Sequence, residues 1–155
     1  MDFYLVRHGR ATSEDIDPRR PLTSAGRVAV EQLGRAATSR RVQVSEIVHS
    51  GILRAEQTAA ILAEILQPIN GIRHGSGLRP EDDPVYAKAE LEKATEPSML
   101  VGHLPHLGRL AAYLANGDPD RSIIEFEPAT IACFSREDRM WKLNWVLAKP
   151  SESAS

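Results

Sequence analysis

Two histidines and three arginines occupy positions where their side chains could act together on one anionic group: Arg7, His8, Arg20, Arg54 and His103. Arginine side chains bind phosphate oxygens with bidentate geometry. A histidine can be the nucleophile that divides a transfer reaction into two steps. Because phosphoryl transfer depends mainly on positioning and charge stabilisation, this set of residues predicts a pocket for a phosphoryl group. No cysteine nucleophile, serine triad or metal-binding carboxylate cluster accompanies it in the sequence.

The two histidines each follow a short apolar run of strand-forming residues. Phe3–Val6 leads into Arg7 and His8, and Ser98–Gly102 leads into His103. Continuous apolar runs of this length are typical of buried strands in a parallel sheet. In open α/β sheets, ligands bind outside the carboxyl ends of the strands. We therefore expect both histidines at the same edge of one sheet.

Arg20 can reach this edge from a loop that precedes a helix. Thr23 is the expected N-cap of that helix, and the apolar face of the helix consists of Gly26, Val30, Leu33 and Ala37. The polar loop at residues 10–20 can fold back over the first strand, which would bring Arg20 to the site. Gly9 is expected to allow a tight turn that brings the backbone close to a ligand.

Arg54 lies in the first turn of a second predicted helix, whose apolar face contains Thr58, Ile61, Leu62 and Ile65. A short strand at residues 46–49 precedes this helix, and Ser50 is its expected cap. The N-terminus of a helix is already positive, so a cation there is locally unfavourable. It becomes favourable when the helix and the arginine hold one anion together. The alternative is that Arg54 is an ordinary exposed side chain.

The remaining elements complete a predicted α/β fold. Further strands are expected at residues 123–126, 130–135 and 140–147, with weak strand character near Ile72. An exposed helix is expected at residues 85–94, and another helix after Leu104-Pro105. The alternation of strands and helices predicts a three-layer α-β-α fold, with a mostly parallel central sheet and an antiparallel edge. Residues 1–147 are predicted to form a single domain, and residues 148–155 a disordered tail.

The composition is ordinary for a soluble globular protein. The chain has 155 residues, of which 42% are hydrophobic and 26% charged, and its net charge is −2. This charge gives no general attraction to nucleic acid or anionic membranes. Cys133, the single cysteine, is expected to fill the core, and no Cys/His spacing indicates a zinc site. Without an apparent signal peptide or an apolar run of membrane-spanning length, a cytoplasmic location is expected.

Four segments in this order resemble the histidine phosphatase superfamily. They are Leu5–Gly9 (LVRHG), Arg20–Thr23 (RPLT), Ser50–Thr58 (SGILRAEQT) and Val101–Pro105 (VGHLP). With the short chain, they are similar to the SixA type of protein phosphohistidine phosphatase, over roughly residues 1 to 147. The resemblance implies a phosphoglycerate mutase-like fold and a hydrolase that acts on phosphohistidine in a phosphorylated protein. No cofactor or metal is expected, because no residue set has metal-site spacing and arginines can supply the positive charge.

The resemblance also implies a role for each residue of the predicted pocket. His8 would be the nucleophile, phosphorylated during turnover. Arg7, Arg54 and His103 would bind the phosphoryl oxygens, with help from Arg20, and phosphate-like anions would compete for the same place. The other three histidines are assigned to structure or to the surface, His106 to the surface of its helix; they are His49, His74 and His106.

The chain differs from larger members of the superfamily in the general acid that protonates the leaving group. Those members carry a helical insertion with a glutamate that protonates an alkoxide leaving group, and the segment between Leu66 and Ser98 is short for that insertion. The candidates for a substitute are Glu81, Asp82 and Asp83. An imidazole leaves more readily than an alkoxide, which favours phosphohistidine as the substrate. Two alternatives stay open: a small-molecule phosphomonoesterase of the same superfamily, and a non-catalytic domain that binds a phosphorylated protein.

Overall fold

The apolar run at the start of the chain forms the strand β1 (Asp2–Arg7), which lies between β4 and β5 in a six-stranded sheet. The structure is a computed structural model that describes residues 1–148. The other elements are α1 (Ser24–Ser39), β2 (Glu46–His49), α2 (Leu53–Leu66), β3 (Ile72–His74), α3 (Pro84–Lys93), β4 (Ser98–Gly102), α4 (His106–Asn116), β5 (Thr130–Glu137) and β6 (Met140–Ala148). Within these residues, no helix is both long and apolar enough to cross a membrane.

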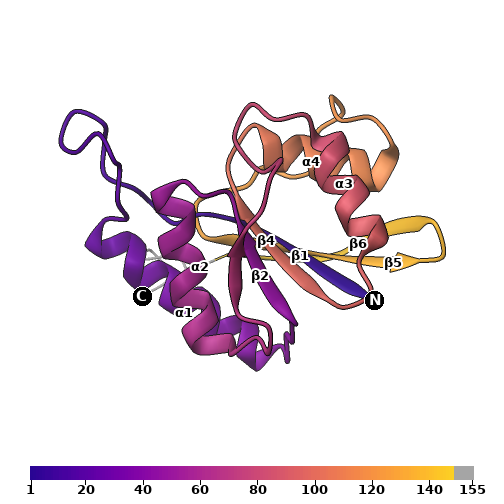
Figure 1. The fold of residues 1–155 in the computed structure, drawn as a ribbon, viewed down its shortest axis with the longest axis horizontal. Helices are drawn as coiled ribbons and strands as arrows, with labels where there is room; N and C mark the ends of the chain where they lie inside the picture. The colour runs from indigo at the N-terminus through magenta and orange to yellow at the C-terminus, as the bar shows by residue number, and fades with distance from the viewer. Residues whose placement is uncertain (149–155) are drawn as a thin grey trace.

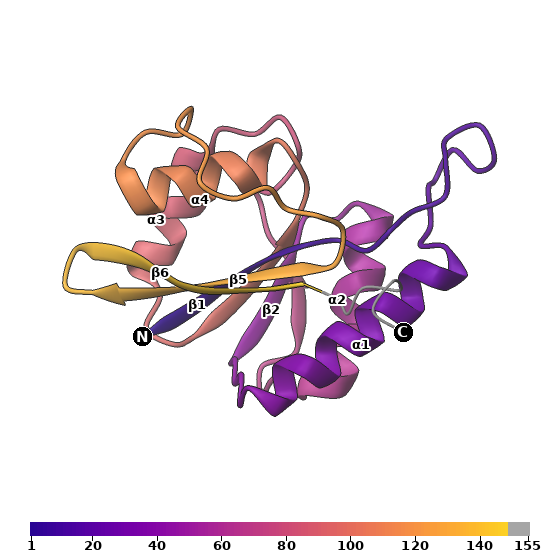
Figure 2. The same ribbon diagram turned by 180° about the vertical axis from the view of Figure 1, so that it is seen from behind.

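The strand order is β3-β2-β4-β1-β5-β6, and helices cover both faces of the sheet (Figure 1, Figure 2). The strands β3, β2, β4 and β1 are parallel to one another, whereas β5 is antiparallel to β1 and β6 to β5. The helices α1 and α2 lie on one face, and α3 and α4 lie on the other. This arrangement confirms the predicted three-layer fold with a mostly parallel sheet and an antiparallel edge.

The register of the central strands brings their ends to one edge. Arg7 of β1 lies opposite Gly102 of β4, and His49 of β2 lies opposite Val101 of β4. The backbone N–H of His8 continues this pairing and donates to the carbonyl oxygen of Gly102 at 3.1 Å. The residues that directly follow β1, β2 and β4 therefore lie side by side, and we call this region the carboxyl edge.

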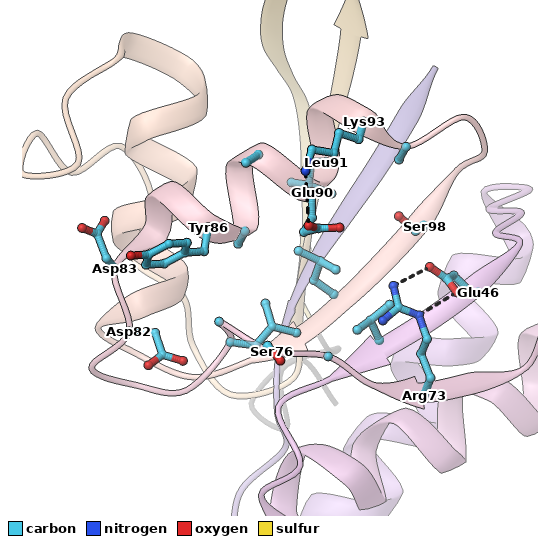
Figure 3. Close-up of a pocket in the computed structure, with 18 residues that line it drawn as sticks. Glu46, Arg73, Ser76, Asp82, Asp83, Tyr86, Glu90, Leu91, Lys93 and Ser98 are labelled. Atoms are coloured by element: carbon cyan, nitrogen blue, oxygen red, sulfur yellow. Dashed lines mark hydrogen bonds and ion pairs between the residues drawn. The ribbon is translucent and has the colours of Figure 1, made fainter.

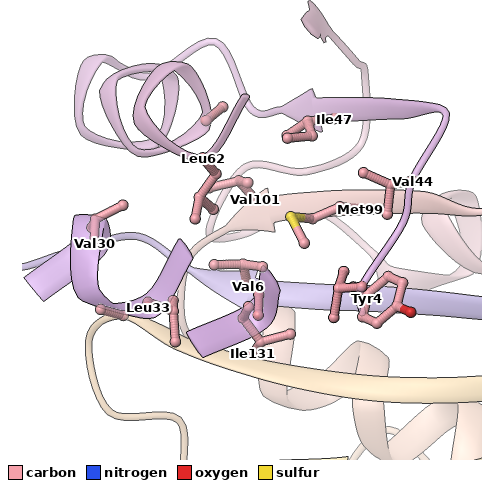
Figure 4. Close-up of a cluster of buried hydrophobic side chains, with 14 of the residues drawn as sticks. Tyr4, Val6, Val30, Leu33, Val44, Ile47, Leu62, Met99, Val101 and Ile131 are labelled. Atoms are coloured by element: carbon pink, nitrogen blue, oxygen red, sulfur yellow. The ribbon is translucent and has the colours of Figure 1, made fainter. Parts of the chain in front are cut away.

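The first hydrophobic cluster packs α1 and α2 against the sheet (Figure 4). It contains the predicted face of α1 and every second residue of the central strands, among them Val6, Val30, Leu33, Leu62 and Ile131. The Thr23 hydroxyl accepts from the Gly26 N–H at 2.9 Å, which confirms the predicted N-cap of α1. Cys133 is buried in this cluster, as predicted. Full burial of one aliphatic side chain of this cluster contributes about 1.5–3 kcal/mol to stability.

The second cluster lies between the opposite face of the sheet and the helices α3 and α4. Phe3 and Phe134 are buried there, and the Phe3 ring lies 5.4 Å from that of Trp141. The prediction that the third helix is exposed is wrong for one side of it: Pro84, Ala87 and Leu91 of α3 are buried. Their spacing of three and four residues is enough to give even this short helix a core-facing side.

Two strand predictions had different outcomes. The weak strand signal near Ile72 is confirmed by β3, whereas residues 123–126 form no strand. Both sides of β1 are already occupied by β4 and β5, and Phe126 instead buries its ring in the second cluster. The predicted tail at 148–155 is wrong for Ala148, which ends β6, and its other residues lie outside the described part of the chain.

Candidate active site

The carboxyl edge brings His8 and His103 together, as the sequence predicts. His8 follows β1 and His103 follows β4, and because these strands are paired in register the two ring centroids are only 5.0 Å apart. Both side chains are buried, with exposed fractions of 8% and 1%. Two buried histidine rings this close together indicate a functional site rather than an accidental contact between surface groups.

The ring of His8 is held in one tautomer. Its Nδ1 lies 2.7 Å from the carbonyl oxygen of Gly9, and since a carbonyl oxygen only accepts, Nδ1 must carry the proton. The lone pair is then on Nε2. The Gly9 N–H donates to the Thr58 hydroxyl at 3.1 Å, and that hydroxyl donates to the Arg54 carbonyl oxygen at 2.8 Å. The turn that orients His8 is therefore fixed to α2.

Gly9 is required here for a different reason from the expected one. A Cβ atom at this position would lie 2.7 Å from Cγ2 of Val30 on α1, which is too close for any side chain. The turn after β1 therefore packs directly on α1, and this contact sets the distance between His8 and the helix.

The pKa of His8 is lowered to about 4. Burial is the main cause, because removal from water disfavours the charged ring. The positive charges of Arg54, Arg7 and Arg20 lower it further, while the bond to Gly9 opposes the shift. His8 is consequently neutral at pH 7, with its Nε2 lone pair available.

Three arginines surround this histidine, and none of them forms an ion pair with a carboxylate in the described residues. Nη1 of Arg7 donates to the Phe126 carbonyl oxygen at 2.7 Å, and Arg54 occupies the first turn of α2, as predicted. The Nε atoms of Arg7 and Arg54 are buried and have no hydrogen-bond partner within residues 1–148. Buried donors without an acceptor are costly, and an oxyanion would satisfy them.

The loop at residues 10–20 leads away from the sheet and returns to its own base (Figure 1), so the prediction that it folds back over the first strand is wrong, and Arg20 lies at that base. The neck of the loop is closed by the Thr12 N–H, which donates to the Pro21 carbonyl oxygen at 2.7 Å, and by that of Thr23, which donates to Arg10 at 3.0 Å. Nε of Arg20 donates to the Thr12 carbonyl oxygen at 3.1 Å. The charge of Arg20 lowers the pKa values of both His8 and Arg54, after burial, so the three groups act on one another.

Ser50 is a site residue for which the sequence suggested another role. It does not cap α2, whose N-cap is Ile52. Its hydroxyl lies 2.6 Å from Nε2 of His103 and accepts from the Ile52 N–H at 3.3 Å. Ser50 thus fixes the ring of His103 from the end of the neighbouring strand.

His103 is held neutral even more strongly than His8. Burial is the main cause that lowers its pKa to about 3, followed by repulsion between protonated His103 and a protonated His8, and by the positive charge of Arg54. His106 and Arg79 add smaller effects of the same sign. The exposed Arg79, in the loop after β3, is a further cation near the site that no sequence motif singled out.

The prediction that His106 lies on the helix surface is wrong. Its side chain is completely buried, and burial lowers its pKa, an effect that the carboxylates of Asp82 and Asp83 oppose. The assignment of His49 to structure is confirmed, because its Nδ1 accepts from the Gly51 N–H at 3.0 Å. The exposed ring of His74 stacks on His49 with centroids 6.0 Å apart.

The acidic candidates have structural partners. Oδ2 of Asp82 accepts from the Arg79 N–H at 2.9 Å, and Oδ1 of Asp83 caps α3 by accepting from the Val85 N–H at 3.0 Å. Glu81 is exposed beside them. No group of three or more His, Cys, Asp or Glu side chains within residues 1–148 could hold a metal ion.

Comparison with known proteins places this chain in a family. The family model of the histidine phosphatase superfamily (branch 1) matches residues 3–79. The chain is 28% identical over 123 residues to phosphohistidine phosphatase SixA of Escherichia coli (strain K12), covering 76% of each protein. It is 34% identical over 125 residues to an uncharacterized protein of Picosynechococcus sp., covering 76% of this chain and 74% of the relative. The chain belongs to the histidine phosphatase superfamily.

A solved structure supports the same assignment for this histidine phosphatase. The protein histidine phosphatase SixA complexed with tungstate superposes with a TM-score of 0.82 at 25% identity, covering 96% of this chain and 97% of that chain. The chain is therefore a phosphatase of the SixA type with a phosphoglycerate mutase-like fold. The matched range 3–79 includes His8, Arg20 and Arg54, and His103 joins them through the pairing of β4 with β1.

Proposed function

We propose that this histidine phosphatase hydrolyses phosphohistidine in proteins through a phosphorylated His8. The observation that carries the proposal is the state of His8: buried, neutral, with Nδ1 bonded to Gly9 and with no hydrogen bond to Nε2 from residues 1–148. A neutral imidazole is a good nucleophile toward phosphorus. The surrounding arginine charges both keep it neutral and attract the phosphoryl group.

Substrate binding follows from the unneutralised charge of the site. Arg7, Arg20 and Arg54 bind the phosphoryl oxygens, and the Nε atoms of Arg7 and Arg54 gain the acceptors that the described part of the chain does not give them. His103, fixed by Ser50, contributes its unpartnered Nδ1. Arginine forks suit the planar spread of charge over three equatorial oxygens in the transition state. These side chains supply the positive charge that a metal supplies elsewhere, so no metal is required.

The reaction has two steps. Nε2 of His8 attacks phosphorus, the P–N bond of the substrate breaks, and the leaving imidazole takes a proton from water. A water molecule then attacks the phosphorus of phospho-His8, which returns the electron pair to Nε2 and releases inorganic phosphate. Asp82 and Asp83 are held in local turns, and the charges that act on His8 come from arginines. Because such a site offers little general-acid catalysis, it favours an imidazole over an alkoxide as leaving group.

An activity comparison tests this function. A protein phosphorylated on histidine and a panel of small phosphomonoesters are offered to the wild-type chain, and to His8→Ala as the control. We expect rapid release of phosphate from phosphohistidine, slow release from the phosphomonoesters and no release by the variant. Faster turnover of a phosphomonoester than of phosphohistidine would overturn the proposed substrate, and hydrolysis by His8→Ala would overturn the proposed nucleophile.

A further inference from the structure

A groove of about 810 Å³ lies beside the catalytic histidines, without including either of them (Figure 3). It runs between α3 and the strands β2, β3 and β4, on the face of the sheet that α3 and α4 only partly cover. We call it the α3 groove. Its volume falls in the range of sites that bind substantial ligands.

One end of the α3 groove abuts the active site. The carbonyl oxygen of Leu78 lies 3.6 Å from the place where a Cβ atom on Gly102 would be, and Gly102 directly precedes His103. The Gly75 N–H donates to the His49 carbonyl oxygen at 2.9 Å, and His49 directly precedes Ser50. The groove wall at residues 75–78 therefore lies against the backbone that carries both Ser50 and His103.

The lining of the groove combines an apolar floor with acidic walls. The floor contains Val48, Leu78, Ala87, Leu91 and Leu100. On its wall, Tyr86 is 65% exposed, and tyrosine is enriched in recognition surfaces.

The charges of the groove have the opposite sign to those of the catalytic site. Four carboxylates line it, but only two cations, and each cation is paired inside the groove: Arg73 with Glu46 at 3.0 Å and Lys93 with Glu90 at 3.9 Å. Asp82 and Asp83 form no ion pair in the described part of the chain. An acidic groove thus adjoins a pocket that contains three arginines.

We propose that the α3 groove binds the polypeptide segment next to the phosphorylated side chain, and that it prefers a segment with apolar and basic residues. The inference rests on the proposed function, since it requires a phosphorylated protein as substrate. A phosphoryl group goes to the arginines, while lysine or arginine residues beside it are repelled by them and attracted by the groove carboxylates. Complementary charge of this kind selects partners and fixes their register.

Two phosphohistidine peptides, identical except for a flank of Leu and Lys or of Leu and Glu, test this preference. At low ionic strength, where surface charges are least screened, we expect kcat/KM of the wild-type chain to favour the Lys peptide by about fivefold, the size expected for one or two exposed charge pairs. Glu90→Lys should reduce this ratio toward one. Glu90 is exposed and its ion pair is weak, so the variant should fold.

Glu64→Lys is the matched control, because Glu64 is an exposed carboxylate of α2, on the opposite face of the sheet from the α3 groove, and it should keep the fivefold ratio. Equal kcat/KM for both peptides, or a ratio unchanged by Glu90→Lys, would overturn the proposed binding of the flanking segment in the α3 groove. Neither result would contradict the proposed function. Hydrolysis of neither peptide, with small phosphomonoesters still hydrolysed, would overturn the proposed function and the inference with it.

Discussion

Keeping His8 neutral should make the stability of the fold depend on pH. In the folded chain the pKa of His8 is about 4, mainly because the ring is buried. In an unfolded chain the pKa of a histidine is about 6.5. As the pH falls from about 6.5 to about 4, His8 is protonated first in the unfolded state, so the free energy of unfolding decreases toward acid pH. Between pH 7 and pH 5 this linkage amounts to about 2 kcal/mol for His8 alone. The variant His8→Ala should therefore lose about 2 kcal/mol less than the wild type over the same interval.

Urea unfolding at both pH values, followed by tryptophan fluorescence, measures the difference. The control Ile131→Val shortens a fully buried, non-titrating side chain and should cost about 1 kcal/mol equally at both pH values. The pKa of His103 is also lowered, to about 3. The His8→Ala variant should therefore still lose part of the stability that the wild type loses between pH 7 and pH 5. If His8→Ala loses as much stability between pH 7 and pH 5 as the wild type, His8 is not held neutral by the fold.

Three further outcomes are expected. Arg54→Ala should lower kcat/KM by on the order of 10²-fold with little effect on thermal unfolding, because a cation in the first turn of α2 is locally unfavourable. Arg54→Lys should restore only part of the activity, and an Arg54→Ala variant that unfolds easily yet stays active would make the residue structural. Ser50→Ala should lower kcat/KM by up to about tenfold, the worth of one hydrogen bond to His103, whereas unchanged kinetics would remove Ser50 from the site. Treatment with a metal chelator should leave activity intact, and a loss that a divalent metal restores would contradict catalysis by arginine charge alone.

The sequence predicts the parts of the site that depend on local signals and on sheet topology. Apolar runs directly before Arg7 and His103 mark the ends of parallel strands, and such ends meet at one edge whatever the details of packing. The first turn of α2 is marked by the helical spacing of its apolar residues, which places Arg54 there. Each of these positions can be derived from a window of about ten residues.

Other features depend on contacts between distant segments, which no local window contains. Ser50 and His103 are 53 residues apart in the chain, so their contact appears only once β2 and β4 are paired. Residues 123–126 have strand character in sequence, but they form no strand, and Phe126 instead packs in the second hydrophobic cluster. The α3 groove exists because helices leave part of one sheet face uncovered, which depends on how α3 packs.

The burial of His106 could have been predicted from a signal in the sequence. It precedes Leu110 by four residues and therefore lies on the same face of α4 as the buried stripe. The helical spacing therefore indicates burial, in contrast to the predicted position of His106 on the helix surface. Burial then keeps its ring neutral, with Asp82 and Asp83 opposing that effect.

The most direct test of the proposed mechanism is to trap the phosphorylated enzyme. The chain is mixed with an active phosphoryl donor, quenched at alkaline pH to preserve phosphohistidine, and analysed by mass spectrometry with fragmentation. We predict one phosphoryl group on His8, absent from His8→Ala and reduced when vanadate competes for the pocket. A phosphoryl group on another residue, or undiminished turnover by His8→Ala without any phosphorylated intermediate, would contradict the account of His8 as the nucleophile.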